Sequence, residues 1–368
     1  MGAKKKYTKS ETTKTNNYYC TINAFGWPFV QAVNLSMKRI LIGLLFLTIA
    51  STTHAQDPQF SQFYAAPLYL NPALAGSAHC PRVTLNYRNQ WPALNNAFVT
   101  YAAGYDQNID ALSGGIGVIL MNDKAGEGTI NTTTASFMYA YQATISRKAS
   151  IRAALKATFV QKKLDWDKLS FGDMIDPRYG FVYQTLEQRP ADLNRSFVDF
   201  SAGIVGYSDL VYGGVAIDHL TQPDEAFIVS GGSELPMKIT AHFGAMIPIG
   251  YYSPRMNKDE GTFISPNIIY QQQRGFNQLN LGAYFSKSPF VAGLWYRGSF
   301  GSEDFLSSDS FIALVGFTRG MFKVGYSYDI TVSQLSNASG GAHEVSLGIQ
   351  FQCKPKKKRF RPISCPTF

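Results

Sequence analysis

The sequence lacks the marks of several common protein classes. After residue 55 it contains no run of about 18 consecutive apolar residues, so no membrane-spanning helix is predicted there. It has no His-Glu-x-x-His, Gly-x-Ser-x-Gly or phosphate-loop motif, and its five histidines are scattered. No Cys-x-x-Cys occurs, so neither a zinc site nor a thioredoxin-like motif is indicated. We therefore expect no enzyme, no metal site and no cofactor.

The longest apolar run belongs to an export signal. In MKRILIGLLFLTIASTTHA, residues 37–55, two basic residues precede a ten-residue apolar stretch and a small-residue cleavage site. Such a stretch is shorter than the roughly 20 residues that a membrane helix needs. We predict a signal peptide at 37–55 and a mature chain that begins at Gln56. Residues 1–36 are polar and rich in lysine, and we interpret them as an incorrectly assigned start or a dispensable extension.

The formal charge of +9 does not indicate a nucleic-acid partner. Residues 1–55 hold seven Lys or Arg and one Asp or Glu, which leaves 27 basic against 24 acidic residues in the mature chain. Six of those 27 lie in the tail, residues 354–368. The body between them is close to neutral, so the basic character resides in a leader and a tail.

Three cysteines survive cleavage: Cys80, Cys353 and Cys365. An exported chain meets an oxidising compartment, where one disulfide can form and one thiol is left over. The basic tail at 354–368 then has two interpretations. It is either a disordered periplasmic run or an interaction segment folded back by a Cys353–Cys365 disulfide.

The mature chain alternates apolar and polar residues with the period of a β-strand. In FKVGYSYDI, residues 322–330, every second side chain is apolar, and 151–162, 198–204 and 344–352 follow the same pattern. Most predicted strands have ten or more residues, the length of a tilted membrane strand. Fourteen are predicted, near 82–90, 97–108, 113–123, 129–145, 150–163, 197–207, 210–221, 235–249, 261–273, 276–287, 289–299, 309–319, 321–331 and 343–353.

The connections separate into two sets by parity. Links at 109–112, 146–149, 208–209, 288 and 320 are short, and 250–260 is the exception in that set. The alternate links are mostly longer, with only 274–275 short, and one spans 164–196. Short periplasmic turns with long surface loops are typical of outer-membrane barrels. We predict an all-β protein with a transmembrane antiparallel β-barrel of about 14 strands at 82–353, embedded in outer-membrane lipids. A soluble sandwich is the alternative, but one this long would usually divide into two domains.

Charged residues fall on the inward faces of the predicted strands. They form either the lining of a pore or an ion-pair network that fills a closed barrel with a plug. The set comprises Arg152, Lys156, Lys162, Asp199, Asp218, Lys323, Asp329 and Glu344.

The long 164–196 loop contains four aspartates, Asp165, Asp167, Asp173 and Asp176. Their spacing does not match a twelve-residue calcium loop. Aspartates that cap turns are the favoured interpretation, and the loop is a candidate partner contact because long ordered loops are usually functional.

Several stretches resemble one known family. They are DPQFSQFYAAPLYLNPALAG (57–76), LNYRNQWP (85–92), KLSFGDMIDPRYGF (168–181), VGYSYDITVSQLSNASGGAHEVSLGIQF (324–351) and the closing Cys-Pro-x-Phe (365–368). Together they resemble the PorP/SprF family of Bacteroidota outer-membrane proteins. The resemblance implies a non-enzymatic component of type IX secretion and gliding motility. It implies help in the export or surface attachment of a large secreted client such as an adhesin. It also implies periplasmic ring or peptidoglycan-linking lipoprotein partners.

The stretch at 56–81 precedes the first strand and is apolar but irregular. We expect it on the periplasmic side, either folded into the barrel mouth as a plug or exposed as a docking strip for a partner. Pro67 and Pro72 are expected to fix an extended path. The plug or partner candidates are Phe60, Phe63, Tyr64, Pro67, Leu70, Asn71, Pro72, Arg88 and Trp91. A plugged barrel also leaves a second function open, that of a channel or transporter for small or hydrophobic solutes.

Overall fold

The structure is a computed structural model that describes most of the chain after residue 56. The predicted signal peptide, the extension before it, Gln56 and the tail at 354–368 lie outside the described residues. The described ranges are 57–78, 80–94, 97–146, 149–190, 192–227, 233–250, 261–300, 307–332 and 339–353.

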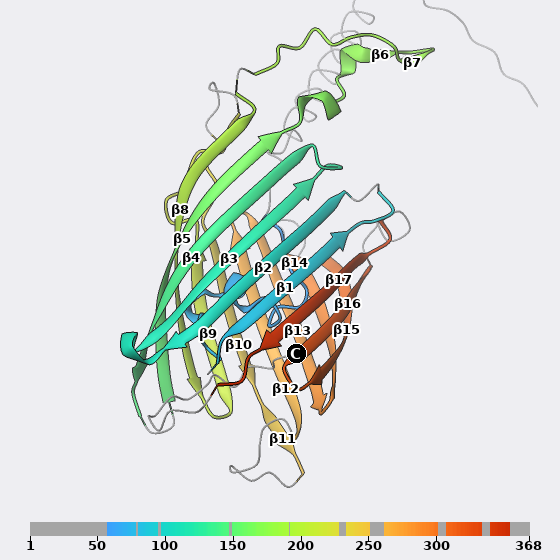
Figure 1. The fold of residues 1–368 in the computed structure, drawn as a ribbon. Coiled ribbons are helices and arrows are strands. Elements are labelled where there is room, and N and C mark those ends of the chain that lie inside the picture. The colour runs from blue at the N-terminus through green and yellow to red at the C-terminus, as the bar shows by residue number, and fades with distance from the viewer. Residues whose placement is uncertain are drawn as a thin grey trace, which may run out of the picture. The chain divides into compact units, whose positions relative to one another are not determined.

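One large antiparallel sheet contains nearly all of the strands (Figure 1). Its members are β1 (Arg82–Gln90), β2 (Phe98–Ile109), β3 (Gly114–Ala125), β4 (Ile130–Thr144), β5 (Ala149–Leu164), β8 (Asn194–Ser208), β9 (Val211–Asp218), β10 (Lys238–Ala245), β11 (Ile247–Ile249), β12 (Thr262–Gln273), β13 (Phe276–Lys287), β14 (Phe290–Phe300), β15 (Ser307–Arg319), β16 (Phe322–Thr331) and β17 (Ala342–Gln350).

The sheet closes on itself into a 14-strand barrel. Each strand pairs with the next one in the chain, and β1 pairs with β17 to join the two ends. Both β10 and β11 pair with β12, so these two pieces occupy one position in the ring. Closure gives every barrel strand except the short β11 a paired strand on each side, and this pairing satisfies backbone groups that lipid cannot. The predicted fold class is confirmed.

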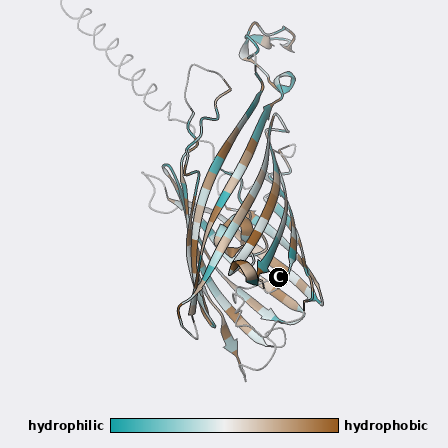
Figure 2. Ribbon diagram, turned by 60° about the vertical axis from the view of Figure 1, so that its left-hand side comes forward, coloured by the Kyte–Doolittle hydropathy of each residue, from teal (hydrophilic) through white to brown (hydrophobic). Residues whose placement is uncertain are grey.

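The alternation predicted from the sequence separates lipid-facing from lumen-facing side chains. In β16, Phe322, Val324 and Tyr326 are 52%, 45% and 42% exposed, whereas Ser327 and Asp329 between the outward residues are buried. Hydrophobic and hydrophilic residues alternate along the strands in Figure 2. Outward apolar residues face a hydrocarbon solvent in a membrane barrel, so their exposure is expected.

The connections also follow the predicted parity. One end of the barrel carries the short links 110–113, 209–210, 288–289 and 320–321 together with one longer link, 250–261, and the other end carries the long links 165–193 and 219–237. We call these the short-turn end and the long-loop end; in outer-membrane barrels short turns are typical of the periplasmic side. None of the helices in the described ranges is long and apolar enough to cross a bilayer.

Two strands differ from their predicted form. The strand expected at 235–249 is interrupted at Met246, whose backbone N–H donates to the carbonyl of Leu210 in the turn before β9. The strand expected at 210–221 ends at Asp218, because His219 has a φ of 61° and leaves the extended region.

Candidate functional site

Residues 57–77, here called the N-terminal segment, lie inside the barrel (Figure 1). Phe60, Phe63, Tyr64 and Leu70 are between 3% and 5% exposed. The ring of Phe63 packs 4.8 Å from that of Trp295, which points inward from β14. An irregular apolar stretch is therefore removed from water by the lumen wall, where it forms the central part of the buried core.

Short helical turns shape the middle of the segment. Helix α2 (Pro67–Leu70) and the 3₁₀ turn η1 (Pro72–Leu74) each begin with a proline, whose missing N–H would have had no helical partner there. Asn71 lies between them, accepts the N–H of Ala73 at 2.9 Å and donates to the carbonyl of Ile204 at 3.3 Å. The prediction that both prolines give an extended path is wrong, since the fixed φ of proline also suits a first helical position.

The first of three polar attachments surrounds Ser61. We call Ser61, Arg88, Arg297, Asp329 and Glu344 the Ser61 cluster. The Ser61 hydroxyl donates to Asp329 at 2.6 Å and accepts from Arg88 at 2.7 Å and Arg297 at 2.9 Å. Its backbone N–H donates to Glu344 at 2.6 Å. Every member is buried, so each charge depends on its partners rather than on water.

Two arginines hold two carboxylates within this cluster. Arg88 contacts Asp329 at 2.9 Å and Glu344 at 3.2 Å, and Arg297 contacts Asp329 at 3.1 Å. These four charges come from β1, β14, β16 and β17. The N-terminal segment thus adds Ser61 to a buried network whose members are far apart in the chain.

The second attachment surrounds Asp57, the first described residue. Its carboxylate lies 2.8 Å from Nε2 of His219 and 3.4 Å from Nζ of Lys238, and it accepts from Gln273 at 3.4 Å. The other ring nitrogen of His219 lies 2.8 Å from Asp199. We call these five residues the Asp57 cluster.

Charge governs the protonation of two members of the Asp57 cluster. Burial alone would lower the pKa of His219, but the carboxylates of Asp57 and Asp199 outweigh burial and raise that pKa to about 10. Burial alone would raise the pKa of Asp57, but Lys238 and His219 outweigh it and hold that pKa well below its usual range. At neutral pH an imidazolium therefore bridges two carboxylates.

The third attachment surrounds Gly76. Its N–H donates to Asp106 at 2.8 Å, and Asp106 is held by Arg82 at 2.9 Å. Its carbonyl accepts from Arg152 at 2.9 Å. Arg152 is fully buried on β5, so the last turn of the segment is fixed to the wall by a desolvated guanidinium.

The register of the strands gives the direction of the segment. Lys238 pairs with Asp218 and with Gln273 at the ends of β9, β10 and β12, so Asp57 lies toward the long-loop end. Asp106 lies near the close of β2, beside the short turn 110–112. The segment therefore runs through the lumen toward the short-turn end. The segment was expected at the periplasmic mouth of the barrel, and its first residues lie instead toward the long-loop end.

A disulfide joins Cys80 to Cys353, with their Cα atoms 5.6 Å apart. The predicted pairing of Cys353 with Cys365 is wrong, and Cys365 lies outside the described residues. Cys80 precedes β1 and Cys353 follows β17, and these two strands are neighbours in the closed ring, with Arg82 opposite Gln350. Ring closure therefore brings together two cysteines 273 residues apart in the sequence.

The remaining N-terminal candidates occupy different places. Arg88 belongs to the Ser61 cluster, as described above. Trp91 instead lies at the long-loop rim between β1 and β2, where its backbone N–H donates to the carbonyl of Gly341 at 2.8 Å. Its ring packs 5.4 Å from that of Phe98. Trp91 is thus part of the rim rather than of the lumen network.

The loop at 165–193 carries short turns and the two-residue strands β6 (Ile175–Asp176) and β7 (Gly180–Phe181) at the long-loop end. Asp176 accepts the N–H groups of Arg178 at 2.8 Å and Tyr179 at 2.9 Å, and these bonds lower the pKa of its carboxyl. Asp173 accepts the N–H of Leu186 at 2.6 Å.

The four loop aspartates do not converge on one point. Asp165 pairs with Lys168 at 3.9 Å, and Asp167 pairs with Arg189 at 3.7 Å. Across the described ranges, no group of His, Cys, Asp and Glu side chains is arranged to hold a metal ion. Turn capping accounts for Asp176, whereas Asp173 joins two distant parts of the loop through Thr185 and Leu186.

Some members of the clusters were visible in the sequence and others were not. Most of the predicted inward charges are buried, and Lys156 pairs with Asp218 at 2.6 Å. Sequence inspection missed His219, Lys238 and Arg297. Arg297 occupies an inward position of the alternating stretch FVAGLWYRGSF and could have been found there. His219 lies in a loop, where the sequence has no alternating pattern that would show which way its side chain points.

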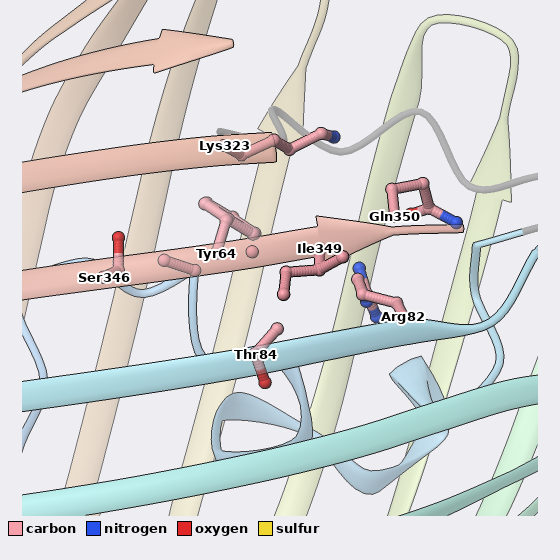
Figure 3. Close-up of a pocket in the computed structure, with 9 residues that line it drawn as sticks. Tyr64, Arg82, Thr84, Lys323, Ser346, Ile349 and Gln350 are labelled. Carbon is pink, nitrogen blue, oxygen red and sulfur yellow. The ribbon is translucent and has the colours of Figure 1, made fainter. Parts of the chain in front are cut away.

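A small cavity lies between the N-terminal segment and the wall formed by β1, β16 and β17 (Figure 3). It encloses about 20 Å³, room for about one water molecule. Tyr64 reaches it from the segment, and Arg82, Thr84, Lys323 and Ser346 reach it from the strands.

The sequence model of a known family covers most of this chain. The family described as type IX secretion system membrane protein PorP/SprF matches residues 52–349. The chain belongs to this family. A PorP/SprF barrel is an outer-membrane protein, and the family identifies the chain as a component of type IX secretion. No curated protein matches the chain.

Solved outer-membrane barrels are similar to this PorP/SprF chain only in outline. The toluene transporter TbuX of Ralstonia pickettii is 9% identical with a TM-score of 0.43, covering 78% of this chain and 94% of TbuX. The CymD monoaromatic hydrocarbon channel is 11% identical with a TM-score of 0.40, covering 78% and 93%. The KdgM porin is 7% identical with a TM-score of 0.33, covering 74% and 99%.

Proposed function

We propose that this protein assists the export or surface attachment of one large secreted protein through protein–protein contacts, without catalysis. Its expected partners are that client, together with periplasmic ring or peptidoglycan-linking lipoprotein components. The observation that carries the proposal is the N-terminal segment, which fills the lumen and is held there by three buried polar attachments. A barrel filled in this way is suited to act as a scaffold.

The long-loop end offers the surface for a client. Tyr179, Phe181 and Leu186 are 70%, 63% and 90% exposed on the 165–193 loop. Apolar residues gathered beyond the membrane-facing strands are characteristic of interaction sites. Their supporting turns are fixed by Asp173 and Asp176, so the side chains are presented on an ordered loop.

The experiment is a mild-detergent pull-down of the tagged full chain from its own outer membrane, followed by mass spectrometry. We expect a large secreted surface protein or periplasmic ring components. The double variant Tyr179→Ser/Phe181→Ser should lose the client, while Glu187→Ser in the same loop should retain it. A barrel recovered without any partner would contradict the proposal, as would equal recovery from all three proteins.

Conductance in planar bilayers tests the alternative, a solute channel. We expect no steady conductance from the full protein, because solutes would have to pass the packed segment. Deletion of residues 57–76 should open the lumen if the barrel still folds, which heat-modifiable migration in gels would show. Steady channels from the unaltered protein would favour transport over scaffolding.

A further inference from the structure

The Asp57 cluster has the construction of a carboxylate-binding socket. His219 and Lys238 place two cationic groups on one carboxylate, and the Gln273 amide donates to its second oxygen. Gln273 also accepts the backbone N–H of Asp57 at 3.3 Å. The three socket residues come from the 219–237 loop, β10 and β12, so the wall of the barrel assembles the site.

The socket is positioned by contacts that do not involve Asp57. His219 is oriented by Asp199, which also accepts the Thr221 hydroxyl at 2.8 Å. The Nζ of Lys238 lies 5.0 Å from the centroid of the Tyr69 ring, a cation–π distance. Loss of the Asp57 carboxylate would leave the side chains of His219, Lys238 and Lys156 beside only two carboxylates, those of Asp199 and Asp218, so the site would lack one anion.

The socket also lies where a partner can reach it. The side chains of Asp57 and His219 are 18% and 15% exposed, whereas Glu344 in the Ser61 cluster is fully buried. Asp57 lies at the long-loop end and is the first attachment of the segment. Its displacement does not require rupture of the Ser61 cluster, which holds the chain four residues later.

We propose that His219, Lys238 and Gln273 form a carboxylate-binding site that Asp57 occupies in the resting protein. Its external ligand is a carboxylate of a polypeptide, an acidic side chain or a chain terminus, arriving at the long-loop end. In its choice of a polypeptide ligand this inference rests on the proposed function. The binding chemistry can be tested on purified protein, so failure of this proposal can be distinguished from failure of the proposed function.

The first test uses the full-length Asp57→Ala variant in detergent, with acetate as the probe. The variant should melt at a lower temperature than the wild type, and acetate should raise its melting temperature in a saturable manner, because a ligand that binds only the folded state stabilises it. Acetamide and matched chloride should have no such effect. In Asp57→Ala/Lys238→Met the response to acetate should disappear.

The second test guards against a misfolded alanine variant. Asp57→Asn keeps the size of the side chain and removes its charge. A fluorescent acidic peptide should bind Asp57→Asn at least about tenfold more tightly than the wild type, in which Asp57 competes. The amidated neutral peptide should bind neither protein. Equal effects of acetate and acetamide, or equal peptide affinity for the variant and the wild type, would overturn the proposal. These outcomes do not depend on the client recovered in the pull-down.

Discussion

Replacement of Arg88 by methionine is the sharpest test of how the lumen is filled. Arg88 is 3% exposed, and its guanidinium contacts Asp329, Glu344 and the hydroxyl of Ser61. In Arg88→Met, Asp329 retains Arg297 at 3.1 Å. Glu344 retains the backbone N–H of Ser61 but loses its arginine while fully buried. The variant therefore leaves one desolvated carboxylate without its cation.

The magnitude follows from that uncompensated charge. Removing one partner of a buried ion pair typically costs about 3–5 kcal/mol, whereas replacing both partners by neutral groups is often close to neutral. We expect Arg88→Met to reduce the free energy of unfolding by about 3–5 kcal/mol. Arg88→Met/Glu344→Gln should lie within about 2 kcal/mol of the wild type. The coupling between the two sites is the quantity that a double-mutant cycle measures.

The assay is urea unfolding in detergent, followed by tryptophan fluorescence. Trp295 packs against Phe63, so its emission reports whether the N-terminal segment is in place. Replacing Trp27, Trp91 and Trp166 by phenylalanine isolates that signal. The Trp295 transition of Arg88→Met should occur at lower urea than the loss of β-structure. A single variant that loses less than about 1 kcal/mol, or a double variant as unstable as the single one, would refute the role assigned to the cluster.

Two further predictions concern the other attachments. Gly76 has a φ of +65°, and a Cβ there would lie 2.6 Å from the Cα of Gly115. Gly76→Ala should therefore displace the segment. It should reduce the free energy of unfolding by about 1–3 kcal/mol more than Gly320→Ala does. At Gly320 φ is +62° and a Cβ would meet no atom within 4 Å, so equal losses in urea unfolding would contradict the clash. His219 has a pKa raised to about 10, so its stabilising effect is complete below about pH 6.5 and is lost as pH rises toward 10. Wild-type urea midpoints should therefore fall more steeply over that range than those of His219→Gln, and parallel curves would contradict the charge bridge.

The sequence alone determined the barrel wall, that is, its strands and the turns and loops that connect them. Alternation in stretches such as 322–330 is a local property, because successive side chains of a strand point to opposite faces. The long loop at 165–193 and the short turns were equally visible, since turn residues and loop lengths are read directly along the chain. These local signals were enough to predict a barrel of about 14 strands, in agreement with the closed sheet.

Tertiary structure alone decided what meets inside the wall. Asp57 and His219 are 162 residues apart, and Cys80 and Cys353 are 273 apart. Which residues meet depends on ring closure and on the register of every intervening strand pair, and no local pattern contains either. The predicted Cys353–Cys365 pairing failed for this reason, because it used nearness in the chain. The lumen-filling path of the N-terminal segment likewise follows from contacts that exist only after the sheet has closed.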